Sequence, residues 1–303
     1  MTPEAAAMAR FEYCEPATLD EAVALLRAAR GEAAVLAGGT DLLVQIRERV
    51  RRPAQVVNIK KILGLDAFRF DPAEGLTIGA LATTRALETS DLVRRRYAGL
   101  HAAVVHFASI QVRNRATVVG NVCRASPSAD TLPPLIADGA TVRILGPDGE
   151  RTVELEHFCT GPGRTVLHDG ELVTHVQVPA PAPRTGKVYL KHGRRVEMEL
   201  ATVGVAATVT VDERGALADA RIALAAVAPT PLRARAAEAA LREAARSAPP
   251  DEGAFEAAAD AAASEARPIA DVRASAEYRR EMVRVLVRRA LEHATRLAQE
   301  DTR

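Results

Sequence analysis

Two glycine-bearing segments hold residue types that could bind a phosphorylated cofactor. The first, Ala37-Gly38-Gly39-Thr40-Asp41, follows a short apolar run that begins at Ala33. Backbone N–H groups approach a phosphate closely where side chains are absent, and the Thr40 hydroxyl adds a donor. The segment lacks the three-glycine spacing of a GxGxxG dinucleotide site, and a glycine pair alone is more often a tight turn. The Asp41 carboxylate would repel a phosphate, so we expect it to orient the turn by accepting backbone N–H bonds.

The second segment covers residues 116–130. Its strand-like residues end at Gly120-Asn121, and small and polar residues follow. One interpretation is a turn-rich loop that bonds to itself. The other is the wall of a polar ligand site, in which Asn121 and Ser126 donate and Asp130 accepts from a ribose hydroxyl or an adenine amine. The residues alone leave both alternatives open.

The elements that would position these segments alternate between helix and strand. Hydrophobic spacing predicts helices at 22–29, 84–89 and 92–107, and strands at 33–37, 55–59, 76–81 and 172–178. Residues 18–21 fit a capping box before the first helix. A hairpin is predicted over 141–155, because Pro147-Asp148-Gly149 is a favoured turn sequence.

The proline-rich run at 179–183 is the best domain boundary, since proline is excluded from central strands and helix interiors. Beyond it, the pattern predicts antiparallel strands at 187–191, 202–211 and 217–227. Helices follow at 230–246, 255–266 and 275–297, which are rich in residues of high helix propensity.

The composition excludes several classes of protein. The 303 residues carry 40 Lys+Arg against 39 Asp+Glu, a net charge of +1 that gives no long-range attraction to nucleic acid or an anionic membrane. The basic run Arg47, Arg49, Arg51 and Arg52 is interpreted as a solvated face or a docking surface, because no aromatic residues interleave it. No apolar run approaches the roughly 20 residues of a membrane span, and the start lacks signal-peptide order. We therefore expect a cytoplasmic protein.

Metal chemistry is not expected on this chain. Cys14, Cys123 and Cys159 stand far apart, and the seven histidines show no HxxxH or HExxH spacing. Any metal redox centre would lie on a partner chain, and the cysteines are interpreted as reduced, mostly buried thiols.

Taken together, the two segments resemble the FAD-binding medium subunit of molybdenum hydroxylases, the group of xanthine dehydrogenase and carbon monoxide dehydrogenase. The resemblance rests on AGGTD at 37–41, TVVGN at 117–121 and ASPSAD at 125–130. It extends nearly end to end, from the FEYCEPATLDEAVALL opening to the closing YRREMVRVLVRRAL helix.

The resemblance implies an α+β fold with two domains. Residues 1–182 would form a two-lobed, PCMH-like FAD-binding domain, with lobes at about 1–60 and 61–182, and residues 183–303 a smaller α+β domain with an antiparallel sheet and helices. It also implies an oxidoreductase subunit without catalytic or metal-binding residues of its own. This subunit would pass electrons from partner iron–sulfur clusters to non-covalent FAD and on to an external acceptor. A partner molybdopterin subunit would oxidise the substrate, and the assembly would be (αβγ)2.

The resemblance assigns site residues by position. The pyrophosphate loop is matched by Ala37, Gly38, Gly39, Thr40, Asp41 and Leu42, and the second FAD segment by Thr117, Gly120, Asn121, Arg124 and Asp130. Phe107 stands where an aromatic side chain faces the isoalloxazine, Val173 where an apolar residue packs near the adenine end or the ring, and Lys191 where a lysine approaches the flavin. An ammonium there would favour reduced flavin, which holds negative charge near N1. The alternatives are a core phenylalanine and a solvated surface lysine.

Two other functions stay open at this point. A self-sufficient flavoenzyme of the same FAD fold would turn over a small substrate alone, although the second domain offers no evident acid–base pair. A scaffold subunit would have kept the fold and lost the flavin, and it would bind no yellow chromophore on reconstitution.

Overall fold

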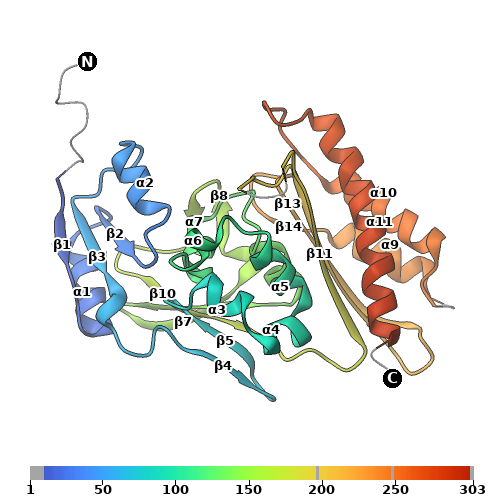
Figure 1. Ribbon diagram of the computed structural model, residues 1–303, viewed down its shortest axis with the longest axis horizontal. Helices are drawn as coiled ribbons and strands as arrows, with labels where there is room; N and C mark the ends of the chain where they lie inside the picture. The colour runs from blue at the N-terminus through green and yellow to red at the C-terminus, as the bar shows by residue number, and fades with distance from the viewer. Residues whose placement is uncertain (1–9, 196–197, 247–248, 301–303) are drawn as a thin grey trace.

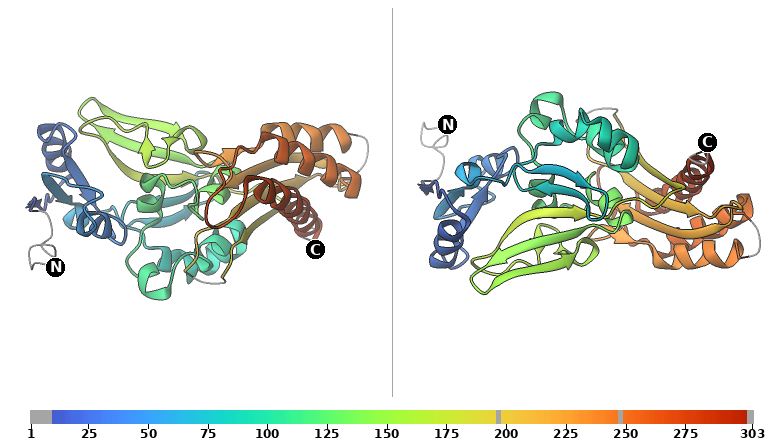
Figure 2. Two further views of the ribbon diagram at one scale, coloured as in Figure 1. Left: turned by 90° about the horizontal axis from the view of Figure 1, so that it is seen from above. Right: turned by 90° about the horizontal axis from the view of Figure 1, so that it is seen from below.

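The computed structural model describes residues 10–195, 198–246 and 249–300. It forms three blocks in a row: a first lobe at one end, a second lobe in the middle and a helix-covered C-terminal unit at the other end (Figure 1). The views from above and below show the same order (Figure 2). Among the described residues, no helix has the length and apolar character needed to cross a membrane.

The first lobe is a small parallel sheet with two helices. It contains β1 (Glu12–Cys14), α1 (Leu19–Ala28), β2 (Ala33–Leu36), α2 (Leu42–Arg47) and β3 (Gln55–Asn58), followed by the 3-10 helix η2 (Ile59–Lys61). The strand order is β1-β3-β2. One half of the predicted capping box forms at α1, where the Thr18 hydroxyl accepts from the Glu21 N–H at 3.2 Å. The Glu21 carboxylate accepts instead from the N–H of Ala17, one residue before the cap, at 2.7 Å.

The second lobe is an antiparallel sheet, with most of its helices inserted between β5 and β6. Its five-stranded sheet has the order β4-β5-β10-β6-β7. The strands are β4 (Phe68–Asp71), β5 (Gly75–Gly79), β6 (Thr141–Gly146), β7 (Gly149–Glu154) and β10 (Leu172–Val178), with a small pair β8 (Cys159–Gly161) and β9 (Arg164–Thr165). The helices are α3 (Thr84–Glu88), α4 (Asp91–Arg96), α5 (Ala98–Val105), α6 (Ile110–Arg113), α7 (Val118–Arg124) and α8 (Leu132–Ala137), with the 3-10 helix η3 (Leu155–His157).

The C-terminal unit is an antiparallel sheet of order β11-β12-β13-β14 covered by helices. Its strands are β11 (Thr185–His192), β12 (Val203–Val211), β13 (Leu217–Ala225) and β14 (Leu232–Arg233). Its helices are α9 (Arg235–Ala244), α10 (Glu252–Glu265) and α11 (Ala276–Glu300), which lie over one face of the sheet (Figure 1). Val205 and Ala207 of β12 belong to the core under these helices.

The other face of that sheet packs against the second lobe. Tyr189, Ala206 and Ala223 join the core that runs through the second lobe to α1. Because side chains alternate along a strand, Lys187, Tyr189 and Lys191 of β11 share this face. Lys187 forms a buried ion pair with Asp138 at 2.6 Å, so charged as well as apolar side chains hold the two parts together.

Several sequence-based element predictions were confirmed and several were wrong. The hairpin turns at Pro147-Asp148-Gly149, with Gly149 at φ 106°. The segment 116–119 is not a strand, because Thr117 caps helix α7. The helix predicted at 92–107 is two helices that meet at Tyr97, whose φ of −131° and ψ of 52° are not helical. The helix predicted from residue 230 begins only at Arg235, after the short strand β14.

Candidate FAD-binding cavity

A cavity of about 770 Å³ lies between the first and second lobes, a size within the usual range of small-molecule sites. Every site residue predicted above except Lys191 lines it: Ala37, Gly38, Gly39, Thr40, Asp41, Leu42, Phe107, Thr117, Gly120, Asn121, Arg124, Asp130 and Val173. The two glycine-bearing segments therefore face one space from opposite lobes.

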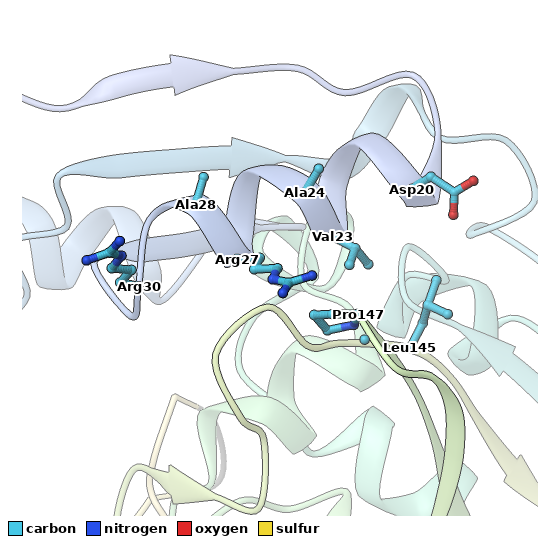
Figure 3. A pocket seen from close by; sticks show the side chains of 9 residues that line it. Asp20, Val23, Ala24, Arg27, Ala28, Arg30, Leu145 and Pro147 are labelled. Atoms are coloured by element: carbon cyan, nitrogen blue, oxygen red, sulfur yellow. The ribbon is translucent and has the colours of Figure 1, made fainter.

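A second hollow of about 720 Å³ lies between α1 and the turn of the β6–β7 hairpin. Figure 3 shows Val23 and Arg27 of α1 opposite Leu145 and Pro147, with Asp20 near one end of the group. Neither glycine-bearing segment contributes to its wall. We therefore take the cavity between the lobes as the candidate functional site.

The loop after β2 offers a row of hydrogen-bond donors. Within the described residues, the backbone N–H groups of residues 38–42 donate no hydrogen bond to another part of the chain. Gly39 has φ +78°, a conformation that favours glycine. A Cβ on Gly38 would lie 2.1 Å from the Arg115 carbonyl oxygen. Gly38 thus lets the two lobes meet closely, whereas the free N–H groups suit an anionic ligand.

Asp41 does not orient this loop in the way we expected. It makes no side-chain cap bond to α2. Its Oδ1 accepts from Gln45 Nε2 at 2.6 Å, and its Oδ2 pairs with Arg124 Nε at 2.7 Å. The expectation failed because a guanidinium from α7 lies within reach of the carboxylate. The pair neutralises Asp41 and links the two lobes.

The second glycine-bearing segment begins with a capped helix. The Thr117 hydroxyl accepts from the Gly120 N–H at 3.0 Å, and a Cβ on Gly120 would lie 2.7 Å from that hydroxyl. Asn121 accepts from the buried Thr131 hydroxyl through Oδ1 at 2.6 Å. This bond fixes the side chain, and the Asn121 amide nitrogen has no protein acceptor in the described part of the chain.

Asp130, at the end of this segment, is bonded to the C-terminal unit. Its Oδ1 accepts from the Tyr189 hydroxyl at 2.8 Å and its Oδ2 pairs with Lys191 Nζ at 2.8 Å. Burial raises the pKa of Asp130, against the opposing effect of Lys191 and Tyr189. The carboxylate thus holds the cavity wall in place, and its contact with a ribose or an adenine stays a prediction.

Lys191 is neither a solvated lysine nor a lining residue of the cavity. Its side chain is 7% exposed and pairs with Asp130. Its Nζ also donates to the His106 carbonyl oxygen at 3.3 Å. Lys191 therefore joins two stretches of the cavity wall, next to Phe107 and at Asp130.

Phe107 is a partly exposed lining residue rather than a core phenylalanine. The buried Arg113 holds the turn on which it lies, because its Nη1 donates to the carbonyl oxygens of Val105, Phe107 and Ala108 at 3.0, 2.8 and 3.2 Å. Arg113 also pairs with Glu88 at 2.9 Å. Sequence reasoning missed this pair, because no local pattern marks a buried arginine.

Val173 supplies an apolar part of the wall. It lies in β10, is 4% exposed and stands at the register shift between β10 and β6. The cavity thus combines donor-rich loops with apolar side chains, as sites for amphiphilic cofactors do.

The only metal-ligating cluster found in the described ranges lies outside this cavity. Glu154, Glu156 and His157 bring ligand atoms within 4.8 Å of one another. Glu156 already pairs with Arg233 and Arg235 at 3.2 and 2.9 Å. These ion pairs account for the acidic group without an ion.

Comparison with known proteins decides the family. Residues 9–181 match the family described as FAD binding domain in molybdopterin dehydrogenase, and residues 188–294 match the CO dehydrogenase flavoprotein C-terminal domain. The chain belongs to this family of flavin subunits.

The relatives cover almost the whole chain. It is 35% identical to the carbon monoxide dehydrogenase medium chain of Hydrogenophaga pseudoflava over 94% of this chain and 97% of that one. It is 32% identical to the xanthine dehydrogenase FAD-binding subunit of Escherichia coli O157:H7 over 94% and 96%. A solved structure of carbon monoxide dehydrogenase from H. pseudoflava, which lacks the Mo-pyranopterin moiety, matches with a TM-score of 0.90 and 36% identity, covering 96% and 99%.

For this flavin subunit, the predicted family, α+β fold class, FAD cofactor and oxidoreductase function are confirmed. Sequence reasoning missed Gln45 and Arg51 as cavity residues, as well as Ser128, Gly163 and Leu200. Arg51 was hidden in a basic run that we interpreted as a solvated face or a docking surface.

Proposed function

We propose that this chain binds FAD non-covalently in the cavity between its lobes and works as the electron-transfer flavin subunit of a molybdenum hydroxylase. The observation that carries the proposal is that both glycine-bearing segments line one cavity in a chain of this family. When bound, FAD supplies a group that accepts electrons from partner iron–sulfur clusters and passes them to an external acceptor.

The residues of the cavity suit the parts of this cofactor. The N–H groups of residues 38–42 would bind the diphosphate, with Thr40 as a further donor. Thr117 and Gly120 fix the start of α7, where Asn121 would donate to the ligand. Phe107 and Val173 would pack against its aromatic parts.

Lys191 would influence the flavin without lining the cavity. Its ammonium is 2.8 Å from the Asp130 carboxylate, which offsets much of its charge. We therefore propose that Lys191 affects the flavin mainly by holding Phe107 and Asp130 in place, with a smaller direct electrostatic effect.

The nearest cysteine supports a non-covalent cofactor. Cys123 lines the cavity, and burial, with the neighbouring Cys159, raises the pKa of its thiol to about 12. A thiol in this state is protonated at neutral pH and is a poor nucleophile.

We also propose the finer organisation. The break between Val178 and Thr185 supports a division at 182/183, and the end of η2 supports a lobe boundary near residue 60. The partners would be an iron–sulfur subunit and a molybdopterin subunit in an (αβγ)2 assembly, because the relatives are named as medium chains or FAD-binding subunits. Three free cysteines among the described residues support a cytoplasmic location.

The test is purification of the chain together with the subunits encoded beside it. We expect iron, molybdenum and FAD in one complex. A complex that contains iron and molybdenum but no flavin, even after reconstitution with FAD, would overturn the proposal in favour of a scaffold. Substrate turnover by this chain alone would favour a self-sufficient flavoenzyme.

A further inference from the structure

Three polar side chains form a linked group where the two lobes meet at the cavity, and the chain places a fourth, Arg51, beside them. Arg124 pairs with Asp41, and Asp41 accepts from Gln45. After α2 the chain folds back, so that the N–H groups of Val50 and Arg51 donate to the Gln45 carbonyl oxygen at 2.9 and 3.2 Å. This fold-back brings Arg51 to the cavity, which all of Asp41, Gln45, Arg51 and Arg124 line.

The charges of this group do not balance. Asp41 offsets one guanidinium, that of Arg124. In the described part of the chain, the Arg51 guanidinium has no acidic partner and donates no hydrogen bond. Partial desolvation at the cavity wall and repulsion from the nearby Arg124 guanidinium both lower the pKa of Arg51. An anion between them would relieve this repulsion.

The neighbouring backbone points to the same kind of ligand. Among the residues that the structure describes, the N–H groups of loop 38–42 have no protein acceptors, and Arg124 is tied to that loop through Asp41. An acceptor-rich anion would bind these donors and Arg51 together, and a guanidinium forms paired hydrogen bonds with phosphate oxygens.

We propose that Arg51 is a binding residue for the diphosphate of FAD, which supplies the anionic partner that the described part of the chain does not. This inference rests on the proposed function and adds a residue of the basic run to the site. It also separates Arg51 from Arg52, which has the same charge and is exposed like Arg51 but does not line the cavity.

The experiment measures ligand binding by the full chain after removal of any flavin. Kd is determined for FAD, for ADP and for riboflavin, with the wild type, Arg51→Gln and Arg52→Gln. ADP carries the diphosphate without the flavin, and riboflavin carries the ring without a phosphate. We expect Arg51→Gln to raise Kd about tenfold for FAD and ADP and to leave riboflavin unchanged. Arg52→Gln should bind all three like the wild type.

Arg51→Lys and the salt concentration sharpen the result. Lysine keeps the charge but loses the paired hydrogen bonds, so we expect a loss of about threefold, between those of the wild type and Arg51→Gln. The difference between wild type and Arg51→Gln should shrink in 1 M NaCl. Thermal unfolding of each variant shows whether it is folded.

The outcomes distinguish the inference from the proposed function. Wild-type affinity for FAD in Arg51→Gln, or an equal loss for riboflavin, would overturn the role of Arg51 while leaving FAD binding intact. An equal rise in Kd in Arg52→Gln would show that Arg51 contributes only through the general positive charge of this region. A wild-type chain that binds no FAD after reconstitution would overturn the proposed function itself.

Discussion

In the first-lobe wall of the cavity, the loop 38–42 leaves its N–H groups without acceptors and Arg51 has no anionic partner in the described residues. In the second lobe, by contrast, Asp130 in the wall and Arg113 behind it form their hydrogen bonds with other parts of the protein. Groups with unused bonding capacity are suited to a ligand, and groups with satisfied bonds are suited to holding a shape. The comparison assigns binding mainly to the first wall and positioning mainly to the second.

The largest expected effect comes from separating the two walls. In Gly38→Ala, the new Cβ would lie 2.1 Å from the Arg115 carbonyl oxygen, a backbone atom that cannot rotate away. We expect the variant to retain no FAD and to unfold at a much lower temperature. Flavin absorbance and calorimetry measure both.

Gly253→Ala is the matched control. Gly253 lies in α10 with only ordinary contact to Asp251, and alanine favours a helix. This variant should keep FAD and be as stable as the wild type or slightly more so. A Gly38→Ala protein with normal flavin content would contradict the close approach of the lobes.

The second-lobe wall is tested by removing the cation of its buried ion pair. Lys191→Met leaves the Asp130 carboxylate buried without its cation, since the two side chains are only 7% and 8% exposed. We expect the free energy of unfolding to fall by about 3–5 kcal/mol. Urea unfolding measures this.

Two further variants test whether the unpaired buried charge causes this loss of stability. Asp130→Asn combined with Lys191→Met removes the uncompensated charge and should recover part of the free energy of unfolding. Lys61→Met breaks a pair with Glu15 in which the lysine is 61% exposed, and it should cost less than about 1 kcal/mol. Equal losses in Lys191→Met and Lys61→Met would contradict the difference between buried and exposed pairs.

A smaller effect is expected when the pH is lowered and Glu88 is protonated. Glu88 is the ion-pair partner of Arg113, which holds the turn of Phe107. Burial raises the pKa of Glu88, but hydrogen bonds from Arg85 and Arg113 outweigh it, so the pKa lies below the usual 4.5. The stabilisation is therefore fully present above pH 4.5 and is lost as the pH falls through the lowered value. Urea unfolding of the wild type and Glu88→Gln should differ at pH 7, and the difference should shrink at pH 3. A difference that is constant with pH would exclude this carboxylate as the source.

The smallest effect is expected at the exposed link between the walls. The side chains of Arg124 and Asp41 are 40% and 52% exposed, so solvent screens their attraction. A double-mutant cycle with Arg124→Gln and Asp41→Asn should give a coupling energy of about 0.2–1 kcal/mol in unfolding. A coupling of several kcal/mol would show that this pair is as important as the buried one.

Local patterns predicted the parts of the fold that depend on neighbours in sequence. The turn before Gly149 and the cap at Thr18 follow from their own residues. The segment Val118-Val119 misled us, since β-branched residues favour strands, but the Thr117 cap and the packing of α7 prevailed.

The bonds between distant residues could not be predicted from local patterns. Lys191 and Asp130 are 61 positions apart, and Asp41 meets Arg124 only because the lobes fold against each other. The resemblance to a family supplied the two glycine-bearing segments of the cavity wall together with Phe107 and Val173, and most of the other lining residues were not predicted. It did not supply their partners, such as Tyr189 and Arg113, because a motif match gives positions rather than contacts.

The alternation along β11 sets a limit on how this protein can be divided. Lys187, Tyr189 and Lys191 are the partners of Asp138 and Asp130, yet they come after the proposed division at 182/183. A fragment ending there would keep two acidic groups and lose these three partners, as well as Thr208, whose hydroxyl also donates to Asp138. An exchange of the N-terminal part alone would therefore need a C-terminal part that supplies the same hydrogen-bond donors. The N-terminal part of this chain therefore depends on β11 for the partners of its buried acidic groups.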